Sequence, residues 1–332
     1  MKTQKLIGPI SQLLTMNTLP LKGAISDEQL EIIPQAGIWI KDEKILEVGS
    51  FESLRKKVDW NETTRKSIEG DFVALPGLID CHTHICFGGS RAKDFAMRNA
   101  GKSYLEIAEA GGGIWDTVQE TRALGVADLA KLTQSRAERH LSEGVTTIEV
   151  KSGYGLSISE EIKMLSAIQK TNNRTAADLI PTCLAAHTIP KDWAGSKTEY
   201  IKEITEKLLP VLQKQMLCGR VDAFVEKSAF SAEEVLPYFK RAQELGFDVT
   251  IHADQFSVGG SALAVQIGAI SADHLEASGE KEIQSLAKSE TIAVALPGAS
   301  LGLGCGFTPA RKILDQGGSL AIASDWNPGS AP

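Results

Sequence analysis

The chain of 332 residues contains 42% hydrophobic and 23% charged residues and carries a formal net charge of −7. This composition is ordinary for a globular protein, and the length suits one barrel-sized domain or a barrel with a small companion. The acidic balance and the lack of an arginine-rich run argue against binding to nucleic acid.

The cysteines and the apolar segments predict a cytoplasmic protein that does not enter a membrane. The five cysteines are widely spread and form no CxxC pair, as expected for thiols in a reducing compartment. The first residues lack the unbroken apolar core of a signal peptide. No apolar run is long enough to span a bilayer.

Residues 1–74 differ in pattern from the rest of the chain. Short alternating segments, such as GIWIKDEKILEVGSF at residues 37–51, have the period-two pattern and the charged turn of a β-hairpin. We therefore predict a small β-domain over residues 1–74.

From residue 75 to residue 332, brief apolar runs rich in β-branched residues alternate with segments of helical period. Eight such runs, nearly all separated by helices, are what a parallel (β/α)₈ barrel requires, because parallel strands need crossover connections. An open doubly wound sheet is the alternative, but no GxGxxG follows the first strand. The runs occupy residues 77–84, 145–155, 179–188, 221–227, 248–255, 270–276, 291–298 and 319–328.

Polar residues cluster at the ends of these predicted strands, where a buried parallel strand should be apolar. In a barrel these ends face one mouth, which is where enzyme sites of this fold lie. Five of the six histidines occupy such positions. The sixth, His140, stands in the charged segment RAERHLSE and is expected at the solvated surface. The strand-end residues are His82, His84, Lys151, Tyr154, His187, Glu226, His252, His274 and Asp325.

The spacing of His82 and His84 predicts a metal site. Side chains at i and i+2 of a strand point the same way, so both rings can face the mouth while Thr83 turns away. With His252 and Asp325 they form a nitrogen and oxygen donor set that suits one zinc or iron ion. A single histidine at the edge of the core is as often only hydrogen-bonded, so the prediction depends on the whole set.

A cation at this position predicts hydrolysis at an sp² carbon. It would lower the pKa of a water molecule toward roughly 7 and polarise a carbonyl. Asp325 can accept the proton of the water and pass it to a leaving nitrogen. His274 lies near enough in the barrel order to stabilise the developing oxyanion or to share in proton transfer.

Several motifs carry a resemblance to a known family. LPGLIDCHTH, IHADQ and ASDWNPG are similar to the amidohydrolase superfamily, whose fold is a barrel with a small β-sandwich built from both chain ends. More narrowly, FGGSRAKDFAMRNAGKSYLEIAEAGGGI, EVKSGYGL, AAHTIP and DWNPGSAP resemble the imidazolonepropionase family. The resemblance covers essentially the whole chain.

This resemblance implies opening of 4-imidazolone-5-propanoate to N-formimino-L-glutamate in histidine degradation, with one Zn²⁺ or iron ion and often a homodimer. It implies that His274 is catalytic and that Tyr104 helps to line the pocket. Arg91 can bind the propanoate carboxylate through bidentate hydrogen bonds. The implied metal ligands are His82, His84, His252 and Asp325. The implied substrate contacts are Arg91, Tyr154, His187, Asn327, Gly329 and Ser330.

The chain departs from the family at two places. Gln255 stands where some members have a glutamate; it can hydrogen-bond the substrate ring within the catalytic site but cannot act as a base. Family members also continue for several dozen residues beyond Pro332, with a helix and returning sandwich strands. We expect this 332-residue piece alone to fold poorly, because an uncovered eighth strand exposes apolar surface.

Two other functions share these residues. A deaminase or another cyclic amidase would use the same ligands, but Arg91 and the NPGS segment at residues 327–330 favour a carboxylated substrate. An inactive metal-binding fragment is the second alternative. Lys151 is expected in a structural ion pair or lining the pocket, and the glycines at 111–113 in a flexible loop near the mouth.

Overall fold

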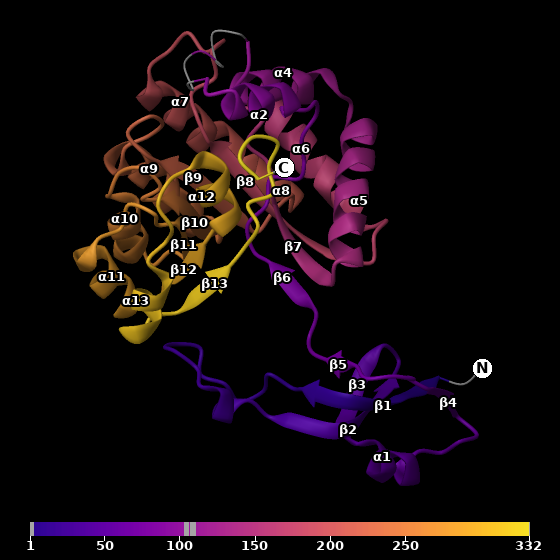
Figure 1. Ribbon diagram of the computed structural model, residues 1–332. Coiled ribbons are helices and arrows are strands. Elements are labelled where there is room, and N and C mark those ends of the chain that lie inside the picture. Colours follow the sequence, from indigo (N-terminus) through magenta and orange to yellow (C-terminus); the bar gives the residue numbers. More distant parts are fainter. Residues whose placement is uncertain (1–2, 103–105, 107–110, 332) are drawn as a thin grey trace. The chain divides into compact units, whose positions relative to one another are not determined.

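The computed structural model describes residues 3–102, 106 and 111–331. It divides the chain into two compact units, Met1–Gly77 and Leu78–Pro332, which are described separately below (Figure 1).

The first unit is a mixed five-stranded sheet with a short helix against it. Strand β1 pairs antiparallel with β2 and parallel with β4 and β5, and β3 pairs antiparallel with β2. Phe51 and Leu54 of α1 pack on Leu6 of β1. The elements are β1 (Gln4–Leu14), η1 (Asp27–Gln29), β2 (Ile32–Lys41), β3 (Lys44–Ser50), α1 (Phe51–Lys57), β4 (Thr63–Lys66) and β5 (Val73–Ala74).

The hairpin predicted within residues 37–51 is confirmed. Strands β2 and β3 are joined by Asp42 and Glu43, whose φ angles are 47° and 65°. Two central residues with positive φ give a turn whose twist matches that of the flanking strands. In the described residues this unit forms one sheet rather than two facing sheets.

The second unit is the predicted (β/α)₈ barrel, with eight parallel strands in sequential order. Several strands are buried on both faces, as β10 shows, which is why they appear as nearly continuous apolar runs. The strands are β6 (Leu78–Asp80), β7 (Val145–Lys151), β8 (Asp178–Ala186), β9 (Arg220–Val225), β10 (Asp248–Ala253), β11 (Ser271–His274), β12 (Ile292–Ala295) and β13 (Leu320–Ile322).

Helices surround this barrel, and most of them bury apolar side chains against the strands (Figure 1). Helix α9 begins with a capping box in which Ser231 and Glu234 each bond the other's backbone amide. The helices are α2 (Ala92–Asn99), α4 (Ile114–Ala123), α5 (Val126–Ser142), α6 (Ile158–Asn172), α7 (Lys197–Glu203), η2 (Ile204–Leu208), α8 (Leu209–Gln215), α9 (Ala232–Glu244), α10 (Gly260–Ile267), α11 (Glu280–Ala287), α12 (Pro297–Leu303) and α13 (Ala310–Asp315).

The barrel closes just beyond the ends of its first and last strands. A parallel bridge joins Thr83 to Trp326. The amide of His84 donates to the carbonyl of Trp326 at 2.9 Å, and the amide of Asp325 donates to the carbonyl of His82 at 3.1 Å. The segments that carry three of the four predicted metal ligands, His82, His84 and Asp325, therefore also form the seam of the barrel.

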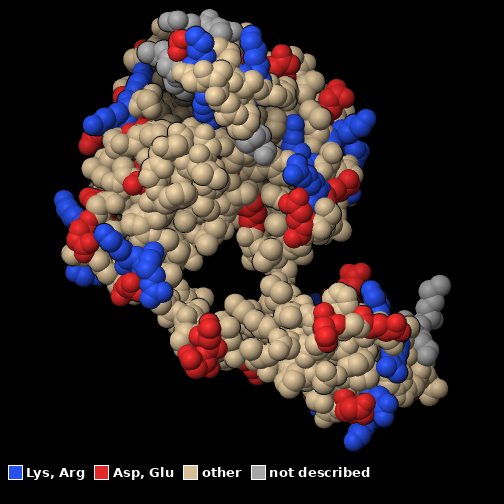
Figure 2. All heavy atoms as spheres, viewed as in Figure 1, with Lys and Arg blue, Asp and Glu red and all other residues tan. Residues whose placement is uncertain are grey.

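The surface is mixed in charge. On the face shown in Figure 2, acidic and basic side chains are interspersed around the margin of the barrel unit, and the middle of this face carries few of either. Among the described residues, no helix is both long enough and apolar enough to cross a membrane.

Candidate active site

The two histidines of the DCHTH segment point the same way, as their spacing predicts. Both rings are buried at the mouth of the barrel. Thr83 between them turns to the neighbouring strand, where its hydroxyl donates to the carbonyl of Glu149 at 2.6 Å. The alternation of a strand therefore continues past the end of β6 and directs His82 and His84 to one place.

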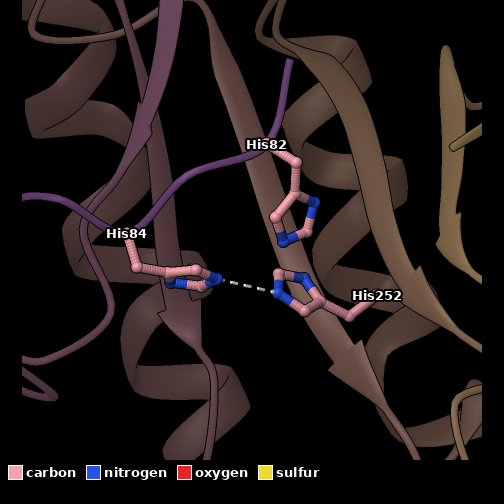
Figure 3. A group of neighbouring side chains, drawn as sticks. All are labelled: His82, His84 and His252. Atoms are coloured by element: carbon pink, nitrogen blue, oxygen red, sulfur yellow. Dashed lines mark hydrogen bonds between the residues drawn. The ribbon is translucent and has the colours of Figure 1, made fainter. Parts of the chain in front are cut away.

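A third imidazole and a carboxylate meet this pair. One nitrogen from each of His82, His84 and His252 lies within 4.8 Å of the others, and Figure 3 shows the three rings turned toward one another. The Nε2 atoms of His84 and His252 are 3.3 Å apart. Oδ1 of Asp325 lies 3.4 Å from Nε2 of His84 and 3.6 Å from Nε2 of His82.

Burial keeps these rings in the form that binds a cation. It holds the pKa of His82 and of His84 well below 6.5, helped by neighbouring positive groups, and it lowers the pKa of His252 to about 3 against the opposing charge of Asp222. Neutral imidazole is the form that coordinates metal. Nε2 of His82 is buried with no hydrogen-bond partner among the described residues. The donor set therefore fits a divalent cation.

Two buried carboxylates hold the outer nitrogens of the ligands. Oδ2 of Asp273 lies 2.6 Å from Nδ1 of His82, and Oδ2 of Asp222 lies 2.9 Å from Nδ1 of His252. For His82, a proton held on Nδ1 by Asp273 leaves the Nε2 lone pair free for a cation and sets the angle of the ring. Asp222 also accepts the backbone amide of His252 at 3.2 Å. His84 instead stacks on His187, with centroids 5.5 Å apart.

Lys151 joins these carboxylates beneath the site. Its fully buried ammonium lies 2.8 Å from Asp222, 2.9 Å from Glu149 and 3.9 Å from Asp273. Burial alone would lower the pKa of Lys151, but the surrounding carboxylates outweigh burial and raise it. The expectation of a structural ion pair for Lys151 is confirmed.

Sequence reasoning missed Asp222 and Asp273. The available signal was a charged residue inside an otherwise apolar buried strand, in VDAFV and in SADH. The role of Asp222 follows from strand neighbours, because β9, which carries Asp222, pairs with β10, which carries His252. Asp273 of β11 instead contacts His82, which follows β6, a strand that is not a neighbour of β11.

His274 and Asp325 leave their strands with a left-handed backbone. Their φ angles are 83° and 51°, a conformation that costs a non-glycine residue about 1 kcal/mol or more. Burial lowers the pKa of His274, but the nearby carboxylates of Glu276 and Asp325 outweigh it and the pKa is raised. Burial raises the pKa of Asp325 to about 6, against the opposing charge of His274.

Most of the predicted site residues line one cavity of about 120 Å³ at the mouth of the barrel. His82 lies behind it, fully buried. Gly329 lines an adjoining cavity of about 690 Å³, and Tyr104 lies outside the described residues. The smaller cavity is lined by His84, Arg91, Ile114, Tyr154, His187, Phe224, His252, Gln255, His274, Asp325, Asn327 and Ser330.

Asn327 organises the NPGS segment from within. Its Oδ1 accepts the amides of Gly329 and Ser330 at 2.8 Å each, and its Nδ2 donates to the carbonyl of Asp325 at 2.7 Å. These two amides are therefore already paired. A Cβ atom at Gly329 would lie 2.4 Å from Nη1 of Arg91, so only glycine lets the guanidinium lie against this loop.

Glu226 faces backbone amides rather than a second ion. One of its oxygens accepts the amides of Phe256 and Ser257 at 2.9 and 3.0 Å, and this fixes the segment that follows Gln255. Gln255 remains at the cavity wall, where its amide can meet a ligand.

The expectation that His140 lies at the solvated surface is wrong. His140 is buried, with Nε2 3.3 Å from Oδ2 of Asp80 and its ring 4.7 Å from that of Trp326. Its position continues the buried stripe of α5 that includes Thr133 and Ala137. The charged neighbours in the sequence belong to other faces of the helix. Asp80 also accepts the amide of Ser324 at 3.1 Å, so His140 and Asp80 lie at the seam between the first and last strands.

Curated relatives resemble this chain over nearly its whole length. An imidazolonepropionase of Bdellovibrio bacteriovorus is 43% identical over 331 residues, which cover 98% of this chain and 77% of that protein. The imidazolonepropionase of Symbiobacterium thermophilum is 38% identical over 330 residues, with the same coverage. The chain belongs to the imidazolonepropionase family. No protein-family model matches the chain.

Solved structures agree with the fold of this imidazolonepropionase family member. A triazine hydrolase from Arthobacter aurescens aligns with a TM-score of 0.71 at 15% identity, over 99% of this chain and 73% of that one. E. coli guanine deaminase aligns with a TM-score of 0.71 at 14% identity, over 99% and 75%. An adenosine deaminase from Xanthomonas campestris with bound zinc gives 0.64 at 16%, over 98% and 70%. At these identities the likeness shows the barrel fold alone.

Proposed function

We propose that this protein hydrolyses the ring C–N bond of 4-imidazolone-5-propanoate. The oxygen of a water adds to the ring carbonyl carbon, the bond from that carbon to the ring nitrogen breaks, and the nitrogen receives a proton. The ring thereby opens to N-formimino-L-glutamate with no net oxidation. The product is that of a step in histidine degradation.

Four residues would hold the cation that this reaction needs: His82, His84, His252 and Asp325. When bound there, a divalent cation supplies the positive charge that lowers the pKa of water toward roughly 7 and polarises the substrate carbonyl. Imidazole and carboxylate donors suit both zinc and iron, so metal analysis of the purified protein decides between them.

The proton transfers fall to residues of the cavity. Asp325, with its pKa raised to about 6, takes the proton of the attacking water and returns it to the departing nitrogen. His274, with a raised pKa, donates a hydrogen bond to the oxygen on which negative charge develops. Gln255 hydrogen-bonds the ring without acting as a base.

Substrate orientation falls to the rest of the cavity. Arg91 binds the propanoate carboxylate, and the NPGS segment at residues 327–330 forms the wall beside it. Tyr154 and His187 line the wall next to His84, with ring centroids 6.0 and 5.5 Å from it. Tyr104 remains a predicted contact.

One observation carries this proposal over its rivals. The cavity that contains His84, His252 and Asp325 also contains Arg91, whose side chain is about 11% exposed. The positively charged guanidinium of Arg91, in the same cavity as the proposed metal ligands, suits a ring that carries a carboxylate. A deaminase that acts on a neutral base needs no such group.

Turnover tests the proposal directly. The complete metal-loaded chain is incubated with 4-imidazolone-5-propanoate, and N-formimino-L-glutamate is identified by mass spectrometry; guanine, cytosine and adenosine are assayed in parallel for ammonia. We expect ring opening and no ammonia. Ammonia release without ring opening would replace the proposal by a deaminase, and metal binding without any turnover would favour an inactive metal-binding protein.

The remaining expectations concern the state of the protein. We propose a cytoplasmic enzyme acting on a small molecule, without nucleic-acid or membrane partners, because its five cysteines are all free and thus suit a reducing compartment. A homodimer stays a prediction from the family, and light scattering on the purified chain measures it.

A further inference from the structure

One face of helix α2 borders the carboxylate end of the cavity. Arg91 precedes the helix, and Asp94 and Arg98 follow at spacings that place all three side chains on the same face. Asp94 is buried at 3% exposure, although it lies in the first turn of a helix whose other residues are largely exposed. A buried carboxylate needs partners, and its partners here belong to the site.

Asp94 holds one edge of Arg91. Its Oδ2 accepts the Nε–H of Arg91 at 2.8 Å. A guanidinium is planar, so a bond to Nε fixes the plane and leaves the two Nη groups for another anion. Nη1 lies against Gly329, at the wall of the cavity.

The same oxygen of Asp94 also fixes the start of helix α4. It accepts the amide of Gly113 at 2.8 Å, and Gly113 has a φ of 86° at the N-terminus of that helix. The next residue, Ile114, lines both cavities. One carboxylate oxygen therefore sets the position of Arg91 and of the amide that precedes Ile114 in the cavity wall.

Arg98 holds the other wall. Its Nη1 donates to the carbonyls of Gly302 and Gly329 at 3.2 and 3.3 Å. Arg91 lies against Gly329, and Arg98 fixes the backbone of Gly329 by bonding its carbonyl. Arg98 also lines the larger cavity without lining the smaller one.

We propose that Asp94 and Arg98 are positioning residues that preorganise the carboxylate subsite around Arg91. This inference depends on the proposed function, in which Arg91 binds the substrate carboxylate. Preorganisation stabilises a complex because the groups are ordered before the ligand arrives. Loss of either residue therefore weakens binding of the carboxylated end and leaves the chemistry at the metal unchanged.

The experiment compares Asp94→Asn and Arg98→Met with charge-matched controls. Asp128→Asn and Lys93→Met alter exposed residues, the second on the same helix. All chains are metal-loaded and complete. Steady-state kinetics use 4-imidazolone-5-propanoate. Calorimetric binding uses imidazole-4-propanoate, which has no bond to hydrolyse, and 4-propylimidazole, which lacks the carboxylate.

For Asp94→Asn we expect KM and the Kd of imidazole-4-propanoate to rise about tenfold, which corresponds to about 1.4 kcal/mol. We expect kcat and the Kd of 4-propylimidazole to change less than about twofold, since a misplaced anion site affects binding uniformly. Arg98→Met should follow the same pattern with a smaller rise. Metal content and both controls should match the unaltered chain.

Two outcomes overturn the inference. The first is an unchanged KM in both variants. The second is an equal loss of affinity for the carboxylated and the neutral ligand, which would indicate a general structural defect. Failure of the proposed function is separate, because the unaltered chain would then not open the imidazolone at all. If Asp94→Asn fails to fold, Arg98→Met alone tests the inference.

Discussion

The metal end and the carboxylate end of the cavity are built in different ways. The proposed metal ligands lie at or just beyond strand ends, and the groups behind them, Asp222, Asp273 and Lys151, are buried inside the barrel. Arg91 precedes helix α2, donates a hydrogen bond to Asp94 of that helix and lies against Gly329, whose carbonyl accepts a bond from Arg98. The metal end therefore depends on the core of the fold, whereas the carboxylate end can vary with few consequences for stability.

The largest effect should come from His252→Ala. Removing one of three imidazoles should abolish retention of the metal, and activity should fall roughly a thousandfold or more, since activation by the metal contributes several kcal/mol. Elemental analysis and kinetics on the same sample measure both. A variant that keeps its metal and its activity would remove His252 from the ligand set.

Lys151→Met tests whether the metal end is part of the core. The change leaves Glu149, Asp222 and Asp273 buried without their cation, and we expect a loss of about 3–5 kcal/mol in the free energy of unfolding. Urea unfolding measures it, with exposed Lys131→Met as the control. A loss below about 1 kcal/mol would mean that this network is not structurally important.

His274→Ala should separate chemistry from metal binding. We expect the metal to stay and kcat to fall about a hundredfold, because a hydrogen-bond donor or proton carrier contributes at least that much. Metal content and kcat are measured on one preparation. Full turnover in this variant would exclude His274 from the mechanism.

A smaller effect concerns His187 and pH. Burial lowers the pKa of His187 to about 4 from an ordinary 6.5. Between these values the unfolded chain binds a proton that the folded chain does not, so the metal-free protein should lose stability as the pH falls from 6.5 toward 4. Urea midpoints of the metal-free protein should fall less steeply for His187→Gln. An equal fall of the urea midpoint with pH in the unaltered chain and in His187→Gln would contradict the lowered pKa of His187.

The metal end was largely predictable from the sequence. Parallel strands bring their carboxyl ends together, so the positions of His82, His84, His252 and Asp325 at predicted strand ends were enough to group them. The partners behind them were not predictable, because pairing of Asp273 with His82 depends on how the barrel closes. Nothing local in the sequence indicates that closure.

The carboxylate end shows what sequence patterns omit. Arg91 came from a family resemblance, but its contact with Asp94 and the link to Gly113 depend on the path of a loop rather than on periodicity. His140 shows the same limit for helices. The charges beside it in the sequence pointed to solvent, while its position three residues beyond Ala137 points to the core.

The seam between the first and last barrel strands has a consequence for folding. Asp80 and Ser324, which bond across it, are 244 residues apart in sequence. Contacts this distant close the largest loop in the barrel and are expected to form late. Because His84 and Asp325 lie on opposite sides of this seam, a cation bound to both would link the first and last barrel strands. Removing the metal should therefore speed deuterium exchange at the amides of His84 and Asp325 well before the middle strands respond.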